Sequence, residues 1–317
     1  MQHDRIVTVT ANPALDRATQ APRIQAGPKL RCLAPRTDPG GGGINAARVV
    51  RLLGGHATVV VTLGGATGEQ LATLLRSVGL EPRVVPIHGE TRESLTVDDA
   101  STGEQYRFVL PGPTLTPDEA ELFLATAEAH VTPGTLVVAS GSLPAGAPPE
   151  TWADLSRRVA AKGGRVVLDT SGEPAKAAFG TGVEVFRCND SEMSDLCGVA
   201  LRHDHEAQER ELRRMIDEGA AKILMMGLGP EGSMVVSADE VHRIPAPSLP
   251  KRSAVGAGDS LVGGLTLGLA RGWSLKDAAT LGVIAGAAAH ATPGTELCRR
   301  DDVERLFEEQ TGYPIPS

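Results

Sequence analysis

The stretch Val255-Gly256-Ala257-Gly258-Asp259-Ser260 is followed at once by the small apolar run Leu261-Val262-Gly263-Gly264-Leu265. Glycines permit backbone conformations that other residues resist, so a turn here can direct successive amide groups at one point. The helix expected to begin near Asp259 adds the positive end of its dipole at the same place. The stretch therefore predicts an anion site beside a carboxylate, which is what phosphoryl transfer to an alcohol requires. A glycine-rich helix start that only packs closely is the alternative.

A second glycine cluster, Gly40-Gly41-Gly42-Gly43-Ile44-Asn45, opens another predicted helix. Four glycines are more than a simple turn needs, and each costs chain entropy on folding. Close approach of the backbone to a ligand would account for them, with Asn45 supplying a polar group. Neither cluster is a Walker A loop, because no Lys-Ser/Thr pair follows the glycines, and neither has the third glycine of a dinucleotide fingerprint.

Apolar segments alternate with segments of helical period through most of the 317-residue chain. Short apolar runs predict buried strands, and the stretches between or after them predict helices. Such alternation is typical of an α/β fold with a mostly parallel sheet covered by helices on both faces. The predicted strands are residues 6–10, 57–61, 136–139, 165–169, 183–187 and 223–226, and the predicted helices are residues 46–53, 69–77, 118–130, 150–161, 206–218 and 259–270.

Two stretches break this alternation and predict a small inserted β-sheet that acts as a lid. Residues 14–37 lack a helical period and contain three prolines. In residues 82–110, a turn separates two strand-like runs, and Tyr106, Phe108 and Leu110 share one face. A second subunit's lid could cover that apolar face, and packing on the lid's own domain is the alternative. We therefore expect an α/β core formed by residues 1–13, 38–81 and 111–317, and a lid formed by residues 14–37 and 82–110.

The composition restricts the partners. A formal net charge of −8 argues against nucleic acid and anionic membranes. No stretch approaches the roughly 20 apolar residues of a membrane span. The N-terminal Met1-Gln2-His3-Asp4-Arg5 has no signal-peptide pattern. The four cysteines show no Cys-x-x-Cys spacing, so reduced thiols in a cytoplasmic protein are expected. His203 and His205 would lie on different faces of a helix and read as surface residues rather than metal ligands.

The chain resembles the ribokinase-like (PfkB) carbohydrate kinase family over roughly residues 6–307. It carries the family's two glycine signatures in the family's order, and within the family it is most similar to the minor bacterial 6-phosphofructokinase form. Further stretches that support the resemblance are Gly27-Pro28-Lys29-Leu30-Arg31-Cys32, Gly103-Glu104-Gln105-Tyr106-Arg107-Phe108-Val109 and Ser140-Gly141-Ser142-Leu143-Pro144.

The resemblance implies a ribokinase-like fold whose lid acts as a dimer clasp, and hence a homodimer. It implies a glycolytic enzyme that uses ATP and Mg²⁺ to phosphorylate the 1-hydroxyl of fructose 6-phosphate, giving fructose 1,6-bisphosphate. Tagatose 6-phosphate kinase and 1-phosphofructokinase are alternatives, since a few pocket contacts decide among these ketose phosphates. A non-catalytic sugar-phosphate sensor on the same scaffold is an alternative of another class.

The catalytic residues are expected in the first stretch. Asp259 is the candidate base, and the amides of Gly256, Ala257 and Gly258 would stabilise charge on the transferring phosphoryl group. The transition state of phosphoryl transfer is loose, so the proton leaves late and an ordinary carboxylate can accept it. A helix N-cap is the alternative role for Asp259.

The nucleotide and metal residues are expected between positions 187 and 232. Asn189 and Glu192 match the family's Asn-x-x-Glu element near Mg²⁺, where water can mediate the contact. An N-terminal capping box explains the same spacing. Arg187-Cys188 stands where relatives usually have Lys-Pro, so a nucleotide-phosphate contact by the planar guanidinium is less certain than one by lysine. The glycines that resemble the nucleotide-proximal turn, or form a plain turn between strands, are Gly227, Gly229 and Gly232.

The sugar-phosphate residues come from three parts of the chain. Asp16 matches the family's sugar-hydroxyl acceptor, and a turn residue is the alternative. With Asp16, the glycine cluster residues Gly41, Gly42 and Asn45 would hold the sugar. The matches to residues that bind the substrate's own phosphate are Lys29, Arg31 and Arg92 on the lid strands, and Ser142.

A monovalent-cation site is the last feature that the resemblance implies. It would involve Ser253-Ala254-Val255 and the loop over residues 289–294. Thr292 and Glu296 stand where the most similar form has Asn and Arg, so K⁺ activation stays open.

Overall fold

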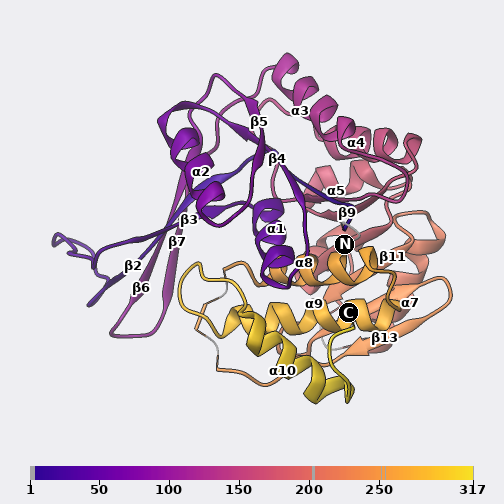
Figure 1. Cartoon of the computed structure of the whole chain (residues 1–317). Coiled ribbons are helices and arrows are strands. Elements are labelled where there is room, and N and C mark those ends of the chain that lie inside the picture. Colours follow the sequence, from indigo (N-terminus) through magenta and orange to yellow (C-terminus); the bar gives the residue numbers. More distant parts are fainter. Residues whose placement is uncertain (1–3, 202–203, 251, 254, 317) are drawn as a thin grey trace.

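The computed structural model describes residues 4–201, 204–250, 252–253 and 255–316. The expectations for the N-terminal Met1-Gln2-His3, for His203 and for Ala254 lie outside these residues. Figure 1 shows an α/β body from which a small sheet projects at one side. All four cysteines are free, as the sequence predicts.

The main sheet is mostly parallel, as predicted. Within the described residues it has nine strands in the order β13-β12-β11-β10-β9-β8-β1-β4-β5. Only β12 and β13, at one edge, run antiparallel to their neighbours. The strands are β1 (Ile6–Thr10), β4 (Thr58–Leu63), β5 (Pro82–Pro86), β8 (Leu136–Ser140), β9 (Arg165–Asp169), β10 (Val185–Asn189), β11 (Ile223–Gly227), β12 (Ser233–Ser237) and β13 (Val241–Ile244).

Helices cover both faces of this sheet (Figure 1). Successive side chains of a strand point to opposite faces, so Val59 and Val61 of β4 join one hydrophobic cluster and Val60 joins the other. The first cluster contains side chains of α1 (Gly42–Leu52), α2 (Gly65–Ser77), α8 (Ala257–Ala270), α9 (Leu275–His290) and α10 (Arg300–Thr311), and the second contains side chains of α3 (Pro117–Ala129), α4 (Thr151–Ala161), α5 (Gly172–Ala178), α6 (Asp190–Cys197) and α7 (His205–Asp217).

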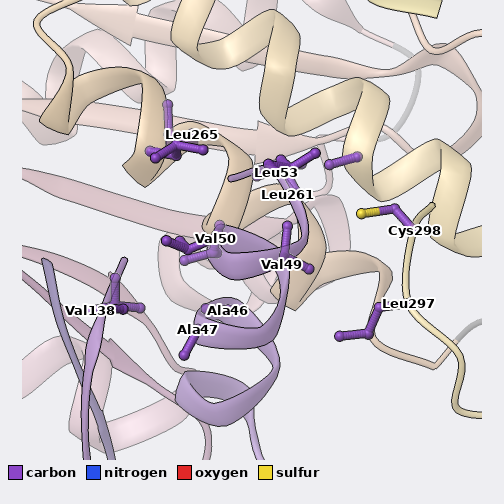
Figure 2. Packing of buried hydrophobic residues seen from close by; sticks show 14 of the residues in the cluster. Ala46, Ala47, Val49, Val50, Leu53, Val138, Leu261, Leu265, Leu297 and Cys298 are labelled. Carbon is purple, nitrogen blue, oxygen red and sulfur yellow. The ribbon is translucent and has the colours of Figure 1, made fainter. Parts of the chain in front are cut away.

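The two helices that carry the glycine signatures pack against each other. Figure 2 shows Val49 and Val50 of α1 beside Leu261 and Leu265 of α8. A Cβ atom at Gly263 would lie 2.8 Å from the carbonyl oxygen of Ala46. The small residues after Asp259 therefore let α8 approach α1 closely, which brings the two N-termini to one place.

The lid is a separate four-stranded sheet in the order β3-β2-β6-β7. Strands β6 and β7 form the predicted hairpin, and β2 pairs with β6 in parallel. The predicted boundaries need correction, because residues 82–86 pair with β4 in the main sheet, whereas residues 38–40 belong to a lid strand. The lid strands are β2 (Ala14–Ala21), β3 (Arg36–Gly40), β6 (Arg92–Asp99) and β7 (Gln105–Val109).

The outer face of the lid is apolar and uncovered in the single chain. Leu95 pairs with Phe108 and Val97 pairs with Tyr106, so these four side chains share one face. Phe108 is 51% exposed, and Leu95 and Tyr106 are also exposed. Three of the four side chains therefore stay uncovered on their own domain, whereas Val97 is buried.

In the part of the chain described here, no helix combines the length and the apolar character that crossing a membrane requires.

Candidate active site

The first glycine signature forms a turn at the start of α8. Gly256 is the N-cap residue with φ 72°, in the left-handed region that favours glycine. The helix starts at Ala257, two residues before the predicted start, so Asp259 lies in its first turn and is not the N-cap. A Cβ atom at Gly258 would lie 3.0 Å from Nη1 of Arg187. The glycine thus lets a guanidinium lie against the turn, where an anion is expected.

Asp259 is buried and held by the second glycine signature. Nδ2 of Asn45 donates a hydrogen bond of 2.8 Å to its Oδ2. Burial raises the pKa of Asp259 to about 6, and the nearby Asp169 carboxylate adds to the rise. The Asn45 hydrogen bond and the positive charge of Arg187 lower this pKa. Around neutral pH the carboxylate is ionised and is more basic than an exposed aspartate.

The second glycine cluster allows close side-chain packing in the site and a backbone conformation that other residues disfavour. A Cβ atom at Gly40 would overlap the Asp16 carboxyl, and one at Gly42 would overlap the Ser140 hydroxyl. Gly41 has φ 120°, which side chains disfavour, and caps α1. The cluster therefore lets α1 begin directly beside Asp16.

A cavity of about 190 Å³ lies between the lid and the two glycine signatures. It brings together most of the predicted sugar residues and the candidate base: Asp16, Gly41, Gly42, Asn45, Arg92, Gly256 and Asp259. Burial raises the pKa of Asp16 to about 6, and the positive charges of Arg92, Arg48 and Arg107 oppose this rise. Below, this space is called the sugar cavity, after the ligand that the sequence predicts for these residues.

Three predicted phosphate-binding residues lie outside the sugar cavity of their own chain. Lys29 and Arg31 are exposed in the connection between β2 and β3, rather than on lid strands as predicted. Ser142 instead lines a neighbouring cavity of about 380 Å³. Its hydroxyl accepts a hydrogen bond of 3.1 Å from Nδ2 of Asn12. Of the basic residues named from the sequence for the sugar phosphate, only Arg92 lines the sugar cavity.

A larger cavity of about 500 Å³ lies on the other side of the turn at residues 256–259, which we call the anion turn because the sequence predicts an anion there. We call this space the nucleotide cavity, after the ligand that the sequence predicts for its residues. Ala257 and Gly258 line it, whereas Gly256 and Asp259 line the sugar cavity. The predicted nucleotide-proximal residues that line it are Arg187, Gly227, Gly229 and Gly232.

Asn189 and Glu192 form the capping box that was the alternative interpretation. Oδ1 of Asn189 accepts from the Glu192 amide, and Oε2 of Glu192 accepts from the Asn189 amide, each at 2.8 Å. Glu192 also lines the cavity that contains Ser142, Asp169 and Arg187. Among the residues that the structure describes, no group of three or more His, Cys, Asp or Glu side chains could hold a metal ion.

Comparison with known proteins identifies the family. A family model for "pfkB family carbohydrate kinase" matches residues 10–302. The chain belongs to this family. It is therefore a phosphotransferase that acts on an alcohol group.

Among individual proteins, the ATP-dependent 6-phosphofructokinase isozyme 2 of Mycobacterium tuberculosis is 43% identical over 307 residues, covering 96% of this chain and 89% of that protein. A 1-phosphofructokinase of Xanthomonas campestris is 34% identical, and the match covers 83% of each chain.

Solved structures agree in fold over nearly the whole chain. Phosphofructokinase-2 of Escherichia coli, solved in complex with potassium, has a TM-score of 0.92 at 38% identity, covering 97% of this chain and 99% of that one. Another structure of that protein is described as its tetrameric inhibited form. Ribokinase of Thermotoga maritima, at 19% identity, has a TM-score of 0.76 over 96% of this chain and 99% of its own, so the fold is ribokinase-like.

The sequence interpretation missed three charged residues of the site. Asp169 ends β9, pairs with Nη1 of Arg187 at 3.2 Å and accepts a hydrogen bond from Ser140. Its position at the carboxyl end of a predicted parallel strand was a usable signal. Arg107 lines the sugar cavity. It alternates with Tyr106 and Phe108 along the strand, and this alternation was a usable signal that its side chain lies on the opposite face of the lid.

The third missed residue, Arg48, lies one turn after Asn45 on α1. Its Nη1 donates at 3.0 Å to Oδ1 of Asn45, which leaves the Nδ2 of that amide to face Asp259. Its Nη2 pairs with Asp38 of the lid at 3.3 Å. An arginine in a helix gives no sequence signal for such a role.

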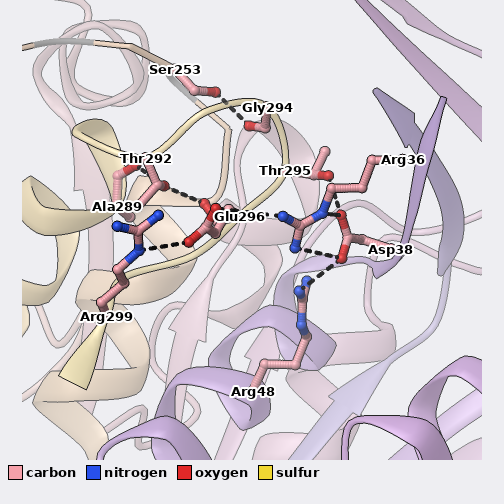
Figure 3. A network of polar contacts seen from close by, with 10 residues as sticks. All are labelled: Arg36, Asp38, Arg48, Ser253, Ala289, Thr292, Gly294, Thr295, Glu296 and Arg299. Atoms are coloured by element: carbon pink, nitrogen blue, oxygen red, sulfur yellow. Dashed lines mark hydrogen bonds and ion pairs between the residues drawn. The ribbon is translucent and has the colours of Figure 1, made fainter. Parts of the chain in front are cut away.

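Figure 3 shows the loop for which the sequence predicts a monovalent-cation site. The Thr292 hydroxyl lies 2.8 Å from the carbonyl oxygen of Ala289 and 2.6 Å from that of Glu296, and its single proton is shared between these two acceptors. Ser253 donates to the Gly294 carbonyl at 2.7 Å. Two hydroxyl protons thus face three carbonyl oxygens in and just after the loop, at Ala289, Gly294 and Glu296. The same loop is tied to the lid, because Glu296 pairs with Arg36 of β3 at 3.5 Å.

Proposed function

We propose that this chain transfers the γ-phosphoryl group of ATP to the 1-hydroxyl of fructose 6-phosphate, producing fructose 1,6-bisphosphate in glycolysis. One observation carries the proposal: the turn at residues 256–259 separates two cavities. Its first helical residues line the nucleotide cavity, and Asp259 lines the sugar cavity. A hydroxyl and a phosphoryl group bound on the two sides would meet at this turn.

The chain's own groups fit the roles that direct transfer needs. The Asp259 carboxylate accepts the proton of the attacking hydroxyl late in bond formation. The amides of Gly256, Ala257 and Gly258, at the positive end of the α8 dipole, stabilise charge on the transferring group. Arg187 adds a full positive charge beside Gly258. Asp16 accepts hydrogen bonds from the sugar hydroxyls.

The basic residues of the lid favour a substrate that carries its own phosphate. Arg92 and Arg107 both line the sugar cavity of a chain whose net charge is −8. Each guanidinium can bind phosphate oxygens through two parallel hydrogen bonds. Lys29 and Arg31 are exposed on the lid connection. They would join this set only in a homodimer whose lids carry them to the partner's sugar cavity.

The residues present fit Mg²⁺ bound chiefly by phosphates and water. Glu192 and Asp169 line one cavity beside Arg187, and Mg²⁺ commonly keeps several waters. When bound, the ion would neutralise charge on the β- and γ-phosphate oxygens. Oδ1 of Asn189 and Oε2 of Glu192 accept the capping hydrogen bonds, so Oε1 of Glu192 is the oxygen outside the box that would reach the ion or one of its waters. K⁺ stays a candidate at the loop of Figure 3.

The uncovered apolar face of the lid supports a homodimer. Leu95, Tyr106 and Phe108 share this face and are all exposed. A second lid stacked on it would remove these side chains from water, at about 25 cal/mol per Å² of apolar surface buried. Phe108→Asp should shift the chain to monomers in light scattering. Oligomers unchanged by this substitution would place the interface elsewhere.

The deciding experiment compares kcat/KM with ATP and Mg²⁺ for fructose 6-phosphate, tagatose 6-phosphate, fructose 1-phosphate and fructose. A clear preference for fructose 6-phosphate is expected. A preference for tagatose 6-phosphate or fructose 1-phosphate would keep the chemistry and change the substrate. Binding of sugar phosphate without turnover of any substrate would favour the sensor.

A further inference from the structure

His290 is a residue of the nucleotide cavity to which the transfer chemistry assigns no role. It is the last residue of α9 and is half-buried. It shares one face of that helix with Val283, Gly286 and Ala287, which all line the cavity. A Cβ atom at Gly286 would lie 3.0 Å from the carbonyl oxygen of Ala257. This helix face therefore begins at the anion turn and reaches His290 one turn, about 6 Å, further on.

The position suits the nucleoside part of the nucleotide. The proposed function places the phosphates at the anion turn, where the amides and Arg187 lie. Away from the turn, the cavity wall is largely apolar, with Pro247, Leu249 and Val283. A purine ring, the least polar part of a nucleotide, fits such a wall. Among the described lining side chains, the polar ones are Arg187, Ser233, Ser248 and His290.

The hydrogen bonds of His290 fix which ring nitrogen carries the proton. Its Nδ1 lies 2.7 Å from the backbone oxygen of Ser253. A carbonyl oxygen only accepts, so Nδ1 must donate, and in the neutral ring Nε2 is then an acceptor. Among the described residues, none forms a hydrogen bond with Nε2 of His290. The amides of Arg252 and Ser253 donate to the His290 carbonyl at 2.8 and 3.2 Å, which holds the residue in place.

We propose that Nε2 of His290 accepts a hydrogen bond from the exocyclic amino group of adenine and so selects the phosphoryl donor by its base. A 6-oxo purine such as guanine presents an acceptor where adenine presents a donor, and two acceptors repel. This inference rests on the proposed function, since it takes the cavity to be the nucleotide site. His290 acts here as a specificity residue and not in the transfer step.

The test is direct binding, measured by calorimetry on the full chain with Mg²⁺ at pH 8. The ligands are ATP, purine riboside triphosphate, which lacks only the amino group, and 2′-deoxyATP. The wild type should bind ATP about five- to tenfold more tightly than purine riboside triphosphate. His290→Asn keeps a donor for the Ser253 carbonyl but loses Nε2, so it should bind these two ligands equally. Ser248→Ala, in the same wall, should retain the preference.

The outcomes separate the two proposals. Equal binding of ATP and its amino-free analogue by the wild type would overturn the assignment, and this comparison needs no variant that folds. A preference retained in His290→Asn would also overturn it. If His290→Asn lost only the preference for ATP over 2′-deoxyATP, His290 would contact the ribose, contrary to the proposal. Absence of any ATP binding to the wild type would instead contradict the proposed function.

Discussion

Asn45 and Asp259 are joined by a hydrogen bond of 2.8 Å although 214 positions separate them in the chain. The bond connects the first turns of α1 and α8, which carry the two glycine signatures. Arg48 fixes the orientation of the Asn45 amide by donating to its oxygen at 3.0 Å. Close packing of α1 on α8 is therefore a condition for positioning the candidate base.

Replacing the base should strongly reduce turnover and leave binding intact. Asp259→Asn keeps the volume and can still contact Asn45, but it cannot accept the hydroxyl proton. We expect kcat to fall by about 10²- to 10⁴-fold, the usual contribution of a general base. Calorimetry should show nearly unchanged affinity for ATP and the sugar phosphate. Near-normal turnover would remove Asp259 as the base.

Removing the Asn45 amide should shift the pH profile. The hydrogen bond from Asn45 lowers the pKa of Asp259, which burial raises to about 6. Asn45→Ala should therefore raise this pKa and move the acid limb of kcat/KM to higher pH. The loss of activity should be larger at pH 6 than at pH 8. A profile that drops uniformly at all pH values would mean that Asn45 only positions the sugar.

The same carboxyls predict opposite pH trends for stability and activity. The pKa values of Asp16 and Asp259 are both raised to about 6 by burial, whereas an unfolded aspartate titrates near 3.9. Between about pH 4 and 6 the folded chain thus binds more protons than the unfolded chain. The contribution of Asp16 and Asp259 to stability therefore falls as the pH rises from about 4 to 6. Activity should rise over the upper part of this range, because the base must be ionised.

Thermal unfolding of the unliganded chain checks the sign. The wild type should lose stability, relative to the double variant Asp16→Asn and Asp259→Asn, as the pH rises from about 4 to 6. If the melting temperatures of the two proteins changed equally with pH, these carboxyls would not titrate in this range.

The sequence predicted the core of the sheet because buried parallel strands read as short apolar runs. It did not predict α9, whose buried residues surround the helix and leave no polar face to give a period. Strand β5 begins and ends with proline, which is tolerated at a sheet edge but masks the strand pattern. The lid boundary predicted at residue 82 was wrong for this reason.

The site was predictable where a motif fixes the local backbone. The turn at Gly256–Gly258 is a local feature, and so is the Asn189–Glu192 box. The distance of Lys29 and Arg31 from the sugar cavity depends on how the β2–β3 connection folds, which no local pattern encodes. The roles of Arg48 and Asp169 depend on contacts between elements distant in the chain, such as the Asp169–Arg187 pair.

The lid arginines should determine the affinity for the phosphate of the sugar. Arg107→Ala should raise KM for fructose 6-phosphate by about 10- to 100-fold, as expected for lost hydrogen bonds to a charged group. KM for ATP should change little. Arg92→Ala should act likewise, with a further effect on Asp16, whose pKa the Arg92 charge lowers. Activity on unphosphorylated fructose is the control, and an equal loss there would contradict phosphate binding.

Arg187 tests whether the guanidinium can replace the lysine that relatives usually have. The side chains of Arg187 and Asp169 are 17% and 13% exposed and pair at 3.2 Å. Arg187→Met would leave the Asp169 carboxylate buried without its partner, and breaking such a pair costs about 3 kcal/mol. It should also raise the pKa of Asp259, which the Arg187 charge lowers.

Arg187→Lys keeps the charge and should fold normally. The planar guanidinium of arginine can bind Asp169 with one edge and a phosphate with another, whereas a lysine ammonium is a single point charge. We therefore expect KM for ATP to rise several-fold in Arg187→Lys, with kcat changed less. An unchanged KM for ATP in both variants would show that Arg187 only stabilises the fold through Asp169.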